Sequence, residues 1–328
     1  MTRPKNNSLK VPASTPNFVH ATMSATSIQK LEDLHRLDNL ELIARQVVEG
    51  FIIGLHKSPY HGFSVEFAEH RLYNAGESVK DIDWKVYART DKMFVKKFEE
   101  ETNLRCQLVL DASSSMYYPQ GEQNNKIRFS IVCAAALMYL MKKQRDATGL
   151  SIFSDKLDVH TGARSTQVHH NLLMTHLENL LGQPAQSRKT AAAKYLHQIA
   201  DNISKRSLVV IFSDMMDNME SSAELFSALQ HLKYARHEVV LFHVTDKKSE
   251  LEFEFENRPY VFIDMETGEK VKLRASDVRE HYTAHARQYK KDLMLKCGQY
   301  KIDFVEADIA ENFMQVLVPY LTRRAKMM

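Results

Sequence analysis

Four short apolar runs, each followed by an aspartate at once or after one hydroxyl residue, constrain the fold of this chain most strongly. The runs are Cys106–Leu110, Leu150–Phe153, Leu208–Phe212 and Val239–Val244. Their length and mainly apolar composition are typical of strands that are buried on both faces of a parallel sheet. Helical patterns alternate with them, at Ile127–Lys143, Val168–Leu181, Ala191–Ser204 and Ala223–Tyr234. This alternation predicts an α/β domain with a doubly wound, mostly parallel sheet and right-handed crossovers.

The first 27 residues have a different composition from the rest of the chain. They contain Arg3, Lys5 and Lys10, no acidic residue and three of the eight prolines. A polar, proline-containing segment of this kind predicts a disordered tail over residues 1–27. The chain has a formal net charge of +3, so the tail accounts for all of it. The neutral remainder argues against a nucleic-acid binder, which would have a clearly basic domain.

The segment between the tail and the α/β domain is predicted to contain a helix and then a small β-rich module. Apolar residues spaced three or four apart predict the helix over about 28–49, and Gly50 and Gly54 predict its end. Trp84, the single tryptophan, lies in the module and is expected to be buried against the following domain. The predicted parts are a disordered tail (1–27), a helix with a β-rich module (28–102) and an α/β domain (103–328) with a hairpin insertion near 251–274.

Cysteine usage and hydrophobicity bear on the compartment. Cys106, Cys133 and Cys297 are far apart, and an odd number without CxxC spacing favours neither a disulfide framework nor a zinc site. No apolar run reaches the roughly 18–20 residues that a membrane span needs. We therefore expect free thiols, no membrane span and a cytoplasmic protein.

Polar residues gather where the predicted strands end. The four apolar runs are followed by Asp111, Ser154-Asp155, Ser213-Asp214 and Thr245-Asp246. The carboxyl ends of parallel strands meet at one edge of a sheet, where open α/β sheets bind their ligands. Carboxylate and hydroxyl oxygens without clustered Cys or His suit a hard divalent cation.

The motif Asp111-Ala112-Ser113-Ser114-Ser115, directly after the first run, is the strongest local signal for such a site. Alternate residues of a loop can turn to the same side, so Asp111, Ser113 and Ser115 could converge on one Mg²⁺ ion. Asp214, at a second strand end, could approach from the other side. The alternative interpretation is structural, because Asp and Ser are also common in turns and helix caps.

These residues and three upstream stretches carry a resemblance to known families. The DxSxS motif, a later Thr and the Ser213-Asp214 pair resemble the metal-ion-dependent adhesion site of von Willebrand factor A domains. Residues 70–77 (HRLYNAGE), 82–89 (IDWKVYAR) and 95–101 (VKKFEEE) resemble the bacterial domain of unknown function 58 family. Members of this family join a short N-terminal module to an A-type domain. The resemblance runs from about residue 62 to the C-terminus.

The resemblance implies a set of ligands for Mg²⁺ or Mn²⁺. It makes Ser113 and Ser115 direct ligands, and Asp111 and Asp214 ligands mainly through water. The family's Thr falls best on Thr190, although the residues around it depart from the family pattern, and Thr166 is the alternative.

The resemblance also implies a function without catalysis. In A domains the open coordination position takes an Asp or Glu of a partner protein. Relatives are typically encoded beside MoxR-type AAA+ ATPases. The expected function is therefore a non-enzymatic adaptor that acts with such an ATPase on a client protein, for example in the maturation of a client complex.

Two other functions compete with the adaptor. A metal-dependent hydrolase or phosphatase could use the same Asp and Ser residues, although haloacid dehalogenase-like enzymes usually have a second Asp where this chain has Ser113. A structural protein with an inactive site is also possible. No GxSxG or GxxxxGK[ST] motif is present, so we expect neither a serine hydrolase nor a nucleotide-binding P-loop. His281 and His285 lack the Glu of an HExxH motif and are expected on a solvated helix face.

Overall fold

The computed structural model describes residues 40–56, 70–72, 84–96, 104–120, 124–183, 191–216, 222–265 and 268–325. Their main feature is a six-stranded sheet with the strand order β10-β7-β6-β3-β4-β5. Its strands are β3 (Arg105–Asp111), β4 (Ala147–Phe153), β5 (Leu157–Arg164), β6 (Leu208–Ser213), β7 (Glu238–Thr245) and β10 (Asp303–Asp308). All neighbouring strands are parallel except β4 and β5. A mixed α/β fold with a mostly parallel central sheet is thus confirmed.

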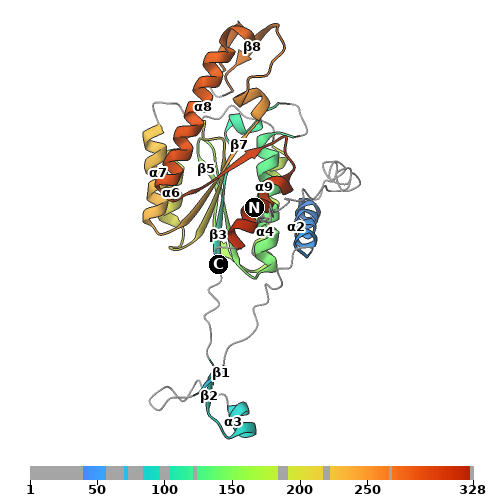
Figure 1. Ribbon diagram of the computed structural model, residues 1–328, viewed down its shortest axis with the longest axis vertical. Helices are drawn as coiled ribbons and strands as arrows, with labels where there is room; N and C mark the ends of the chain where they lie inside the picture. Colours follow the sequence, from blue (N-terminus) through green and yellow to red (C-terminus); the bar gives the residue numbers. More distant parts are fainter. Residues whose placement is uncertain are drawn as a thin grey trace, which may run out of the picture. The chain divides into compact units, whose positions relative to one another are not determined.

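Helices cover both faces of the sheet (Figure 1). One face carries α6 (Ala192–Asn202), α7 (Ser222–Tyr234) and α8 (Ala275–Gln299), and the other carries α4 (Lys126–Lys143), α5 (Gln167–Leu181) and α9 (Phe313–Ala325). None of the helices in the described ranges has the length and apolar character needed to cross a bilayer.

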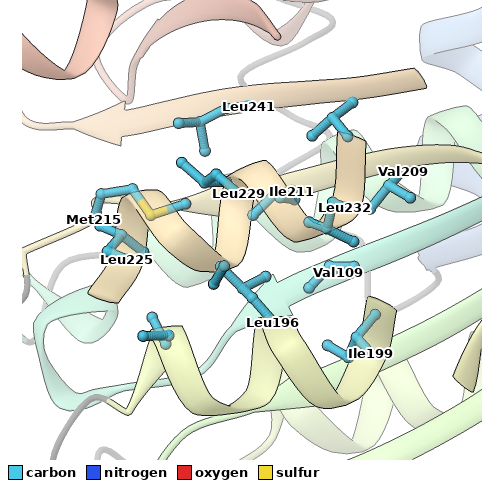
Figure 2. Packing of buried hydrophobic residues seen from close by; sticks show 14 of the residues in the cluster. Val109, Leu196, Ile199, Val209, Ile211, Met215, Leu225, Leu229, Leu232 and Leu241 are labelled. Carbon is cyan, nitrogen blue, oxygen red and sulfur yellow. The ribbon is translucent and has the colours of Figure 1, made fainter. Parts of the chain in front are cut away.

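The central strands are buried on both sides because alternate side chains contribute to two separate cores. Val109, Ile211 and Leu241 point toward α6 and α7, where they pack with apolar side chains such as Leu196 and Leu229 (Figure 2). On the opposite face, the rings of Phe212 and Phe242 stack with centroids 4.8 Å apart, and Tyr320 of α9 packs edge-on against Phe242. Burial on two faces explains why these strands were recognisable as mainly apolar runs.

Two elements differ from the sequence prediction. β5 is an antiparallel edge strand with half-exposed side chains, so it lacks the apolar run by which the other strands were recognised. α2 (Leu40–His56) continues through Gly50 and Gly54, where the sequence predicted its end. A glycine inside a helix costs only about 1 kcal/mol, and α2 also packs on α4 and α9 of the α/β domain. α2 therefore packs on the α/β domain.

The described residues between α2 and β3 form a strand pair and a helix. β1 (His70–Leu72) and β2 (Phe94–Lys96) are antiparallel, and α3 (Trp84–Thr90) lies between them in sequence. Trp84 begins α3 and is 56% exposed, with its ring 6.0 Å from that of Tyr87. The expectation that Trp84 is buried is wrong, because its position at the start of a short helix leaves most of the indole in solvent. The predicted tail, residues 1–27, lies outside the described residues.

An insertion separates β7 from α8. It begins with a π-helical turn, η4 (Lys247–Leu251), and continues into an antiparallel hairpin of β8 (Pro259–Ile263) and β9 (Lys270–Arg274). Rings of Phe253, Phe255, Tyr260 and Phe262 pack together beside Tyr282 of α8. This aromatic cluster fixes the hairpin on the first turns of α8.

Gly149 in β4 marks a close approach between β4 and β5. A Cβ atom at this position would lie 2.2 Å from Gln107 Oε1 and 2.6 Å from the carbonyl oxygen of Thr161. Gly149→Ala should therefore destabilise the protein by about 1–3 kcal/mol through overpacking. Gly162→Ala is the matched control, because a Cβ atom there meets nothing within 4 Å. Equal urea midpoints for the two variants would contradict this interpretation.

Candidate metal centre

The polar residues after β3 and β6 lie where the winding of the sheet changes direction. β3 and β6 are neighbours in the middle of the sheet, and the chain continues to β4 on one side and to β7 on the other. Asp111 ends β3, and Asp214 directly follows β6. Open α/β sheets bind ligands in the crevice at this kind of switch point. The fold therefore brings two of the predicted ligands to the position that favours binding.

Hydrogen bonds fix Asp111 on the buried side of the crevice. Its Oδ1 accepts from the backbone N–H of Ser113 at 2.9 Å, and its Oδ2 accepts from Ser213 Oγ at 2.6 Å. The chain then enters a 3-10 turn, η2 (Ser114–Tyr117), and the Oγ atoms of Ser113 and Ser115 lie 3.1 Å apart. Asp111 and Ser113 are fully buried, whereas Ser115 is partly exposed. Solvent can thus reach the group at Ser115.

Asp214 faces this turn from β6. Its Oδ1 accepts from the backbone N–H of Met216 at 3.1 Å, and a hydrogen bond from Ser115 also reaches its carboxylate. Met215, between Asp214 and Met216 in sequence, has a positive φ of 50°. Its carbonyl oxygen accepts a hydrogen bond from the hydroxyl of Tyr289 in α8. Asp111, Ser113, Ser115 and Asp214 therefore belong to one connected network.

Lys126, a residue that sequence reasoning missed, lies inside the same network. Its side chain is fully buried, and its Nζ lies 2.7 Å from Asp214 Oδ2 and 2.5 Å from Glu250 Oε1. Glu250 lies in η4, and its Oε2 accepts from the backbone N–H of Asp246 at 2.8 Å. Lys126 is the first residue of α4, where the helix dipole disfavours a cation. A buried ammonium at such a position needs both carboxylates to offset its desolvation.

Burial and charge shift the pKa values of these groups in different directions. Burial, assisted by the nearby charge of Asp214, raises the pKa of Asp111 to about 7. Burial also acts to raise the pKa of Asp214, but the charge and hydrogen bond of Lys126 outweigh it and lower the pKa. Burial acts to lower the pKa of Lys126, and the two carboxylates raise it overall. Burial raises the pKa of Glu250 despite Lys126. At neutral pH, Lys126 is charged, Asp214 is ionised and Asp111 can exchange a proton.

The charges and donor atoms of the cluster fit a hard divalent cation. Three buried carboxylates, on Asp111, Asp214 and Glu250, have one ammonium to balance them when ionised. Burial lowers the pKa of the adjacent His243 to about 4, so this side chain adds no charge at neutral pH. Ionisation of all three would leave two net negative charges beside the ammonium, and the raised pKa values of Asp111 and Glu250 keep part of that charge protonated near neutral pH.

The serine hydroxyls have a spacing that matches such an ion. Mg²⁺ takes oxygen ligands at about 2.0–2.1 Å in an octahedron, which puts adjacent ligands about 2.9 Å apart. The separation of 3.1 Å between Ser113 Oγ and Ser115 Oγ is close to that value. In the part of the chain that the structure describes, no three His, Cys, Asp or Glu side chains could hold a metal by themselves. The hydroxyls would thus be an essential part of any metal site here.

The other residues predicted from sequence do not join the cluster. Thr190 lies outside the described residues. Thr166 caps α5, accepting from the backbone N–H of His169. It follows the end of β5, which is antiparallel to β4 and pairs with the start of that strand. Thr166 therefore lies at the amino ends of the parallel strands, away from Asp111 and Asp214, and is excluded as a ligand of this site. The antiparallel direction of β5 is the reason, and no sequence pattern indicated it.

The remaining strand ends have local partners. Ser154 Oγ donates to Asp155 Oδ1 and lies 3.0 Å from it, and Ser249 Oγ donates to Asp246 Oδ2 at 2.6 Å. These residues cap their own turns. Among the described residues, the β3 and β6 ends supply the four predicted ligands, and the turn after β7 adds Glu250 through Lys126.

The sequence matches one protein family and uncharacterized mycobacterial proteins. Residues 69–292 match the family described as "Protein of unknown function DUF58". Uncharacterized proteins from Mycobacterium bovis and Mycobacterium tuberculosis are each 26% identical over 212 residues. These alignments span 65% of this chain and 65% of the length of each relative.

Two solved structures are distantly similar to this chain over 68% and 69% of its length. The conserved hypothetical protein BatB from Bacteroides thetaiotaomicron matches with a TM-score of 0.40 and 13% identity, covering 68% of this chain and 99% of that one. An aerotolerance-related membrane protein from Bacteroides fragilis matches with a TM-score of 0.43 and 14% identity, covering 69% and 100%. No functional conclusion is drawn from likenesses at this level.

Proposed function

The chain belongs to the DUF58 family of proteins of unknown function, and we propose that it is a non-enzymatic adaptor that docks a partner protein through Mg²⁺. The observation that carries the proposal is the convergence of Asp111, Ser113, Ser115 and Asp214 at the switch point of the sheet. We propose that this is a metal-ion-dependent adhesion site in a von Willebrand factor A-like domain.

Each residue has a separate task in this proposal. Ser113 and Ser115 would hold the ion directly, and Asp111 and Asp214 would hold it mainly through water. The ion, or Mn²⁺ in its place, would supply a positive charge and a coordination position for a carboxylate of the partner. Ser213 keeps Asp111 in place by donating to its Oδ2. Ser115, as the partly exposed member, lies on the side from which the partner would approach.

Lys126 gives the site a property that helps docking. Because Asp214 shares its charge with the Lys126 ammonium at 2.7 Å, it can compensate a second cation only in part. Neutral serine hydroxyls compensate none of the charge. A cation at the serines would therefore remain attractive to a carboxylate from outside the chain.

The nature of the partner rests on the family resemblance. We propose a MoxR-type AAA+ ATPase, which the adaptor would recruit to a client or present with one during assembly of the client complex. We also propose that the adaptor lies in the cytoplasm, where thiols such as those of its three buried cysteines stay reduced.

The geometry gives less support to a hydrolase or phosphatase. A nucleophilic Asp111 would need a carboxylate oxygen open to substrate. Both oxygens of Asp111 accept hydrogen bonds, and the residue is 0% exposed. Asp111 is thus better placed to position other groups than to attack a substrate.

An affinity pull-down from the host tests the adaptor function. The full chain is used as bait with Mg²⁺ or with EDTA, beside Ser113→Ala and the control Ser151→Ala. Ser151 is a buried serine of β4 whose hydroxyl contacts Gln107 and His160 instead of the site. We expect the ATPase with wild type and Ser151→Ala in Mg²⁺ only. Recovery of the same partners from every sample would contradict metal-dependent docking.

Cation binding should release a proton at mildly acidic pH. The pKa of Asp111 is raised to about 7 in the metal-free protein, so below that pH the carboxyl must lose its proton to assist a cation. The apparent affinity for Mg²⁺ should rise by up to about tenfold per pH unit between about pH 5.5 and 7 and then level off. Calorimetry at about pH 6 in buffers of different ionisation enthalpy counts the protons. An affinity that does not change over this range would contradict the assignment.

A further inference from the structure

The hairpin of β8 and β9 has two faces of different chemistry. Residues directly opposite each other in an antiparallel pair lie on the same face. Tyr260 and Phe262 therefore share one face with Leu273 and Val271. The two rings join the aromatic cluster of Phe253 and Phe255, whereas Val271, at the end of this face, is 54% exposed. The other face is uncovered within the described part of the chain.

The uncovered face combines an apolar row with a cationic row. Pro259, Val261 and Ile263 of β8 lie opposite Arg274, Lys272 and Lys270 of β9. Val261 and Ile263 are each 54% exposed, although β-branched apolar residues are normally buried in sheets. None of the three cations forms an ion pair with another described residue. The three residues of β8 and the three of β9 together are called the outer hairpin face.

The insertion that carries this face is tied to the candidate metal centre. It starts at the carboxyl end of β7, beside β6, and its first turn supplies Glu250 to Lys126. The helix after the hairpin, α8, supplies Tyr289, whose hydroxyl donates to the carbonyl next to Asp214. The contacts of Glu250 and Tyr289 therefore link the hairpin to the candidate metal centre, at the carboxyl end of the sheet.

We propose that the outer hairpin face is a second docking surface, which binds an acidic segment with interspersed apolar side chains in the partner protein. The inference rests on the proposed function, because one acidic partner would supply both the carboxylate at the metal centre and this segment. Charge complementarity carries the choice of occupant. Three cations in a row, without an ion pair among the described residues, match carboxylates spaced along an extended segment, and Val261 and Ile263 match the apolar residues between them.

Two other occupants agree less well with the residues. A second copy of the chain would present the same cationic row, and like charges would oppose the contact. An anionic lipid surface would meet the turn of the hairpin, which begins and ends with the acidic residues Asp264 and Glu269. The outer face also lacks the exposed aromatic residues that are typical of membrane interfaces.

Site-specific photo-crosslinking in the host tests the proposal. p-Benzoylphenylalanine replaces Val261 in the full chain, and Val168, 80% exposed on α5, is the control position. The cross-linked peptides are sequenced by mass spectrometry. We expect a product at Val261 whose partner peptide is rich in Asp and Glu with apolar neighbours. Its yield should fall at least about tenfold in Lys270→Glu/Lys272→Glu and also at high salt.

The controls separate this inference from the proposed function. Lys205→Glu/Lys291→Glu makes the same change in charge at exposed lysines outside the hairpin and should keep the product. A product with lipid, with this chain itself or with a non-acidic peptide would overturn the inference, as would a yield insensitive to the hairpin charges. If the acidic product persists while the pull-down proves independent of Mg²⁺ and Ser113, the second surface stands and metal-dependent docking fails.

Discussion

Lys126→Met should destabilise the metal-free protein by about 3–5 kcal/mol, the usual effect of removing one partner from a buried ion pair. The loss follows from the position of the ammonium, which is fully buried and lies 2.7 Å from Asp214 and 2.5 Å from Glu250. Methionine fills a similar volume but leaves both carboxylates without a cation. They would have to take up protons, so the destabilisation should grow as the pH rises above their ordinary pKa values. Urea unfolding in EDTA at two pH values measures it.

Lys142→Met is the matched control for this substitution. Lys142 lies in the same helix, but its pair with Glu41 is 3.4 Å long and exposed, so its loss should change stability by less than about 1 kcal/mol. Adding Asp214→Asn and Glu250→Gln to Lys126→Met should recover part of the stability, because amides need no counter-charge. Equal urea midpoints for Lys126→Met and Lys142→Met would show that the buried network contributes little.

Ser113→Ala should weaken Mg²⁺ binding by at least about 10- to 100-fold, the loss that follows even when an indirect support of a metal site is removed. The substitution deletes one of the two hydroxyls that lie 3.1 Å apart and leaves the backbone N–H that bonds to Asp111. The fold should therefore survive, with a change in stability of about 1 kcal/mol. Mn²⁺ binding followed by electron paramagnetic resonance, with Mg²⁺ as competitor, measures the affinity.

Ser151→Ala distinguishes loss of a ligand from loss of a buried hydroxyl. Ser151 is equally buried, and its Oγ is 2.9 Å from Gln107 Nε2 in the core of the sheet. This variant should lose similar stability and retain the affinity for the ion. If both variants bind Mn²⁺ as wild type does, Ser113 is not a ligand.

The central parallel strands β3, β4, β6 and β7 could be predicted from sequence because burial on both faces leaves a mainly apolar run in each. The same argument predicted that Asp111 and Asp214 would meet, since the carboxyl ends of parallel strands share one edge. β5 was missed because an edge strand with half-exposed side chains has no such run. Because β5 is antiparallel to β4, Thr166 lies at the amino ends of the parallel strands, away from Asp111. The pattern of residues did not indicate this direction.

Lys126 and Glu250 could not be predicted, for a different reason. A lysine at the start of a helix ordinarily points into solvent, and its partners lie 88 and 124 residues away in the chain. The contact depends on where the insertion after β7 returns to the sheet, and no local pattern encodes that. The outer hairpin face was similarly hidden, because the pairing of Val261 with Lys272 becomes apparent only when the register is known.

The most direct test of the account is a calorimetric titration of the full-length protein, stripped with EDTA, with Mg²⁺ and then Mn²⁺ at about pH 7.5. We expect one divalent ion per chain and a strongly reduced affinity in Ser113→Ala, because Asp111, Asp214 and the two serine hydroxyls 3.1 Å apart would supply its oxygen ligands. The absence of binding by either ion to the folded wild-type protein would contradict it.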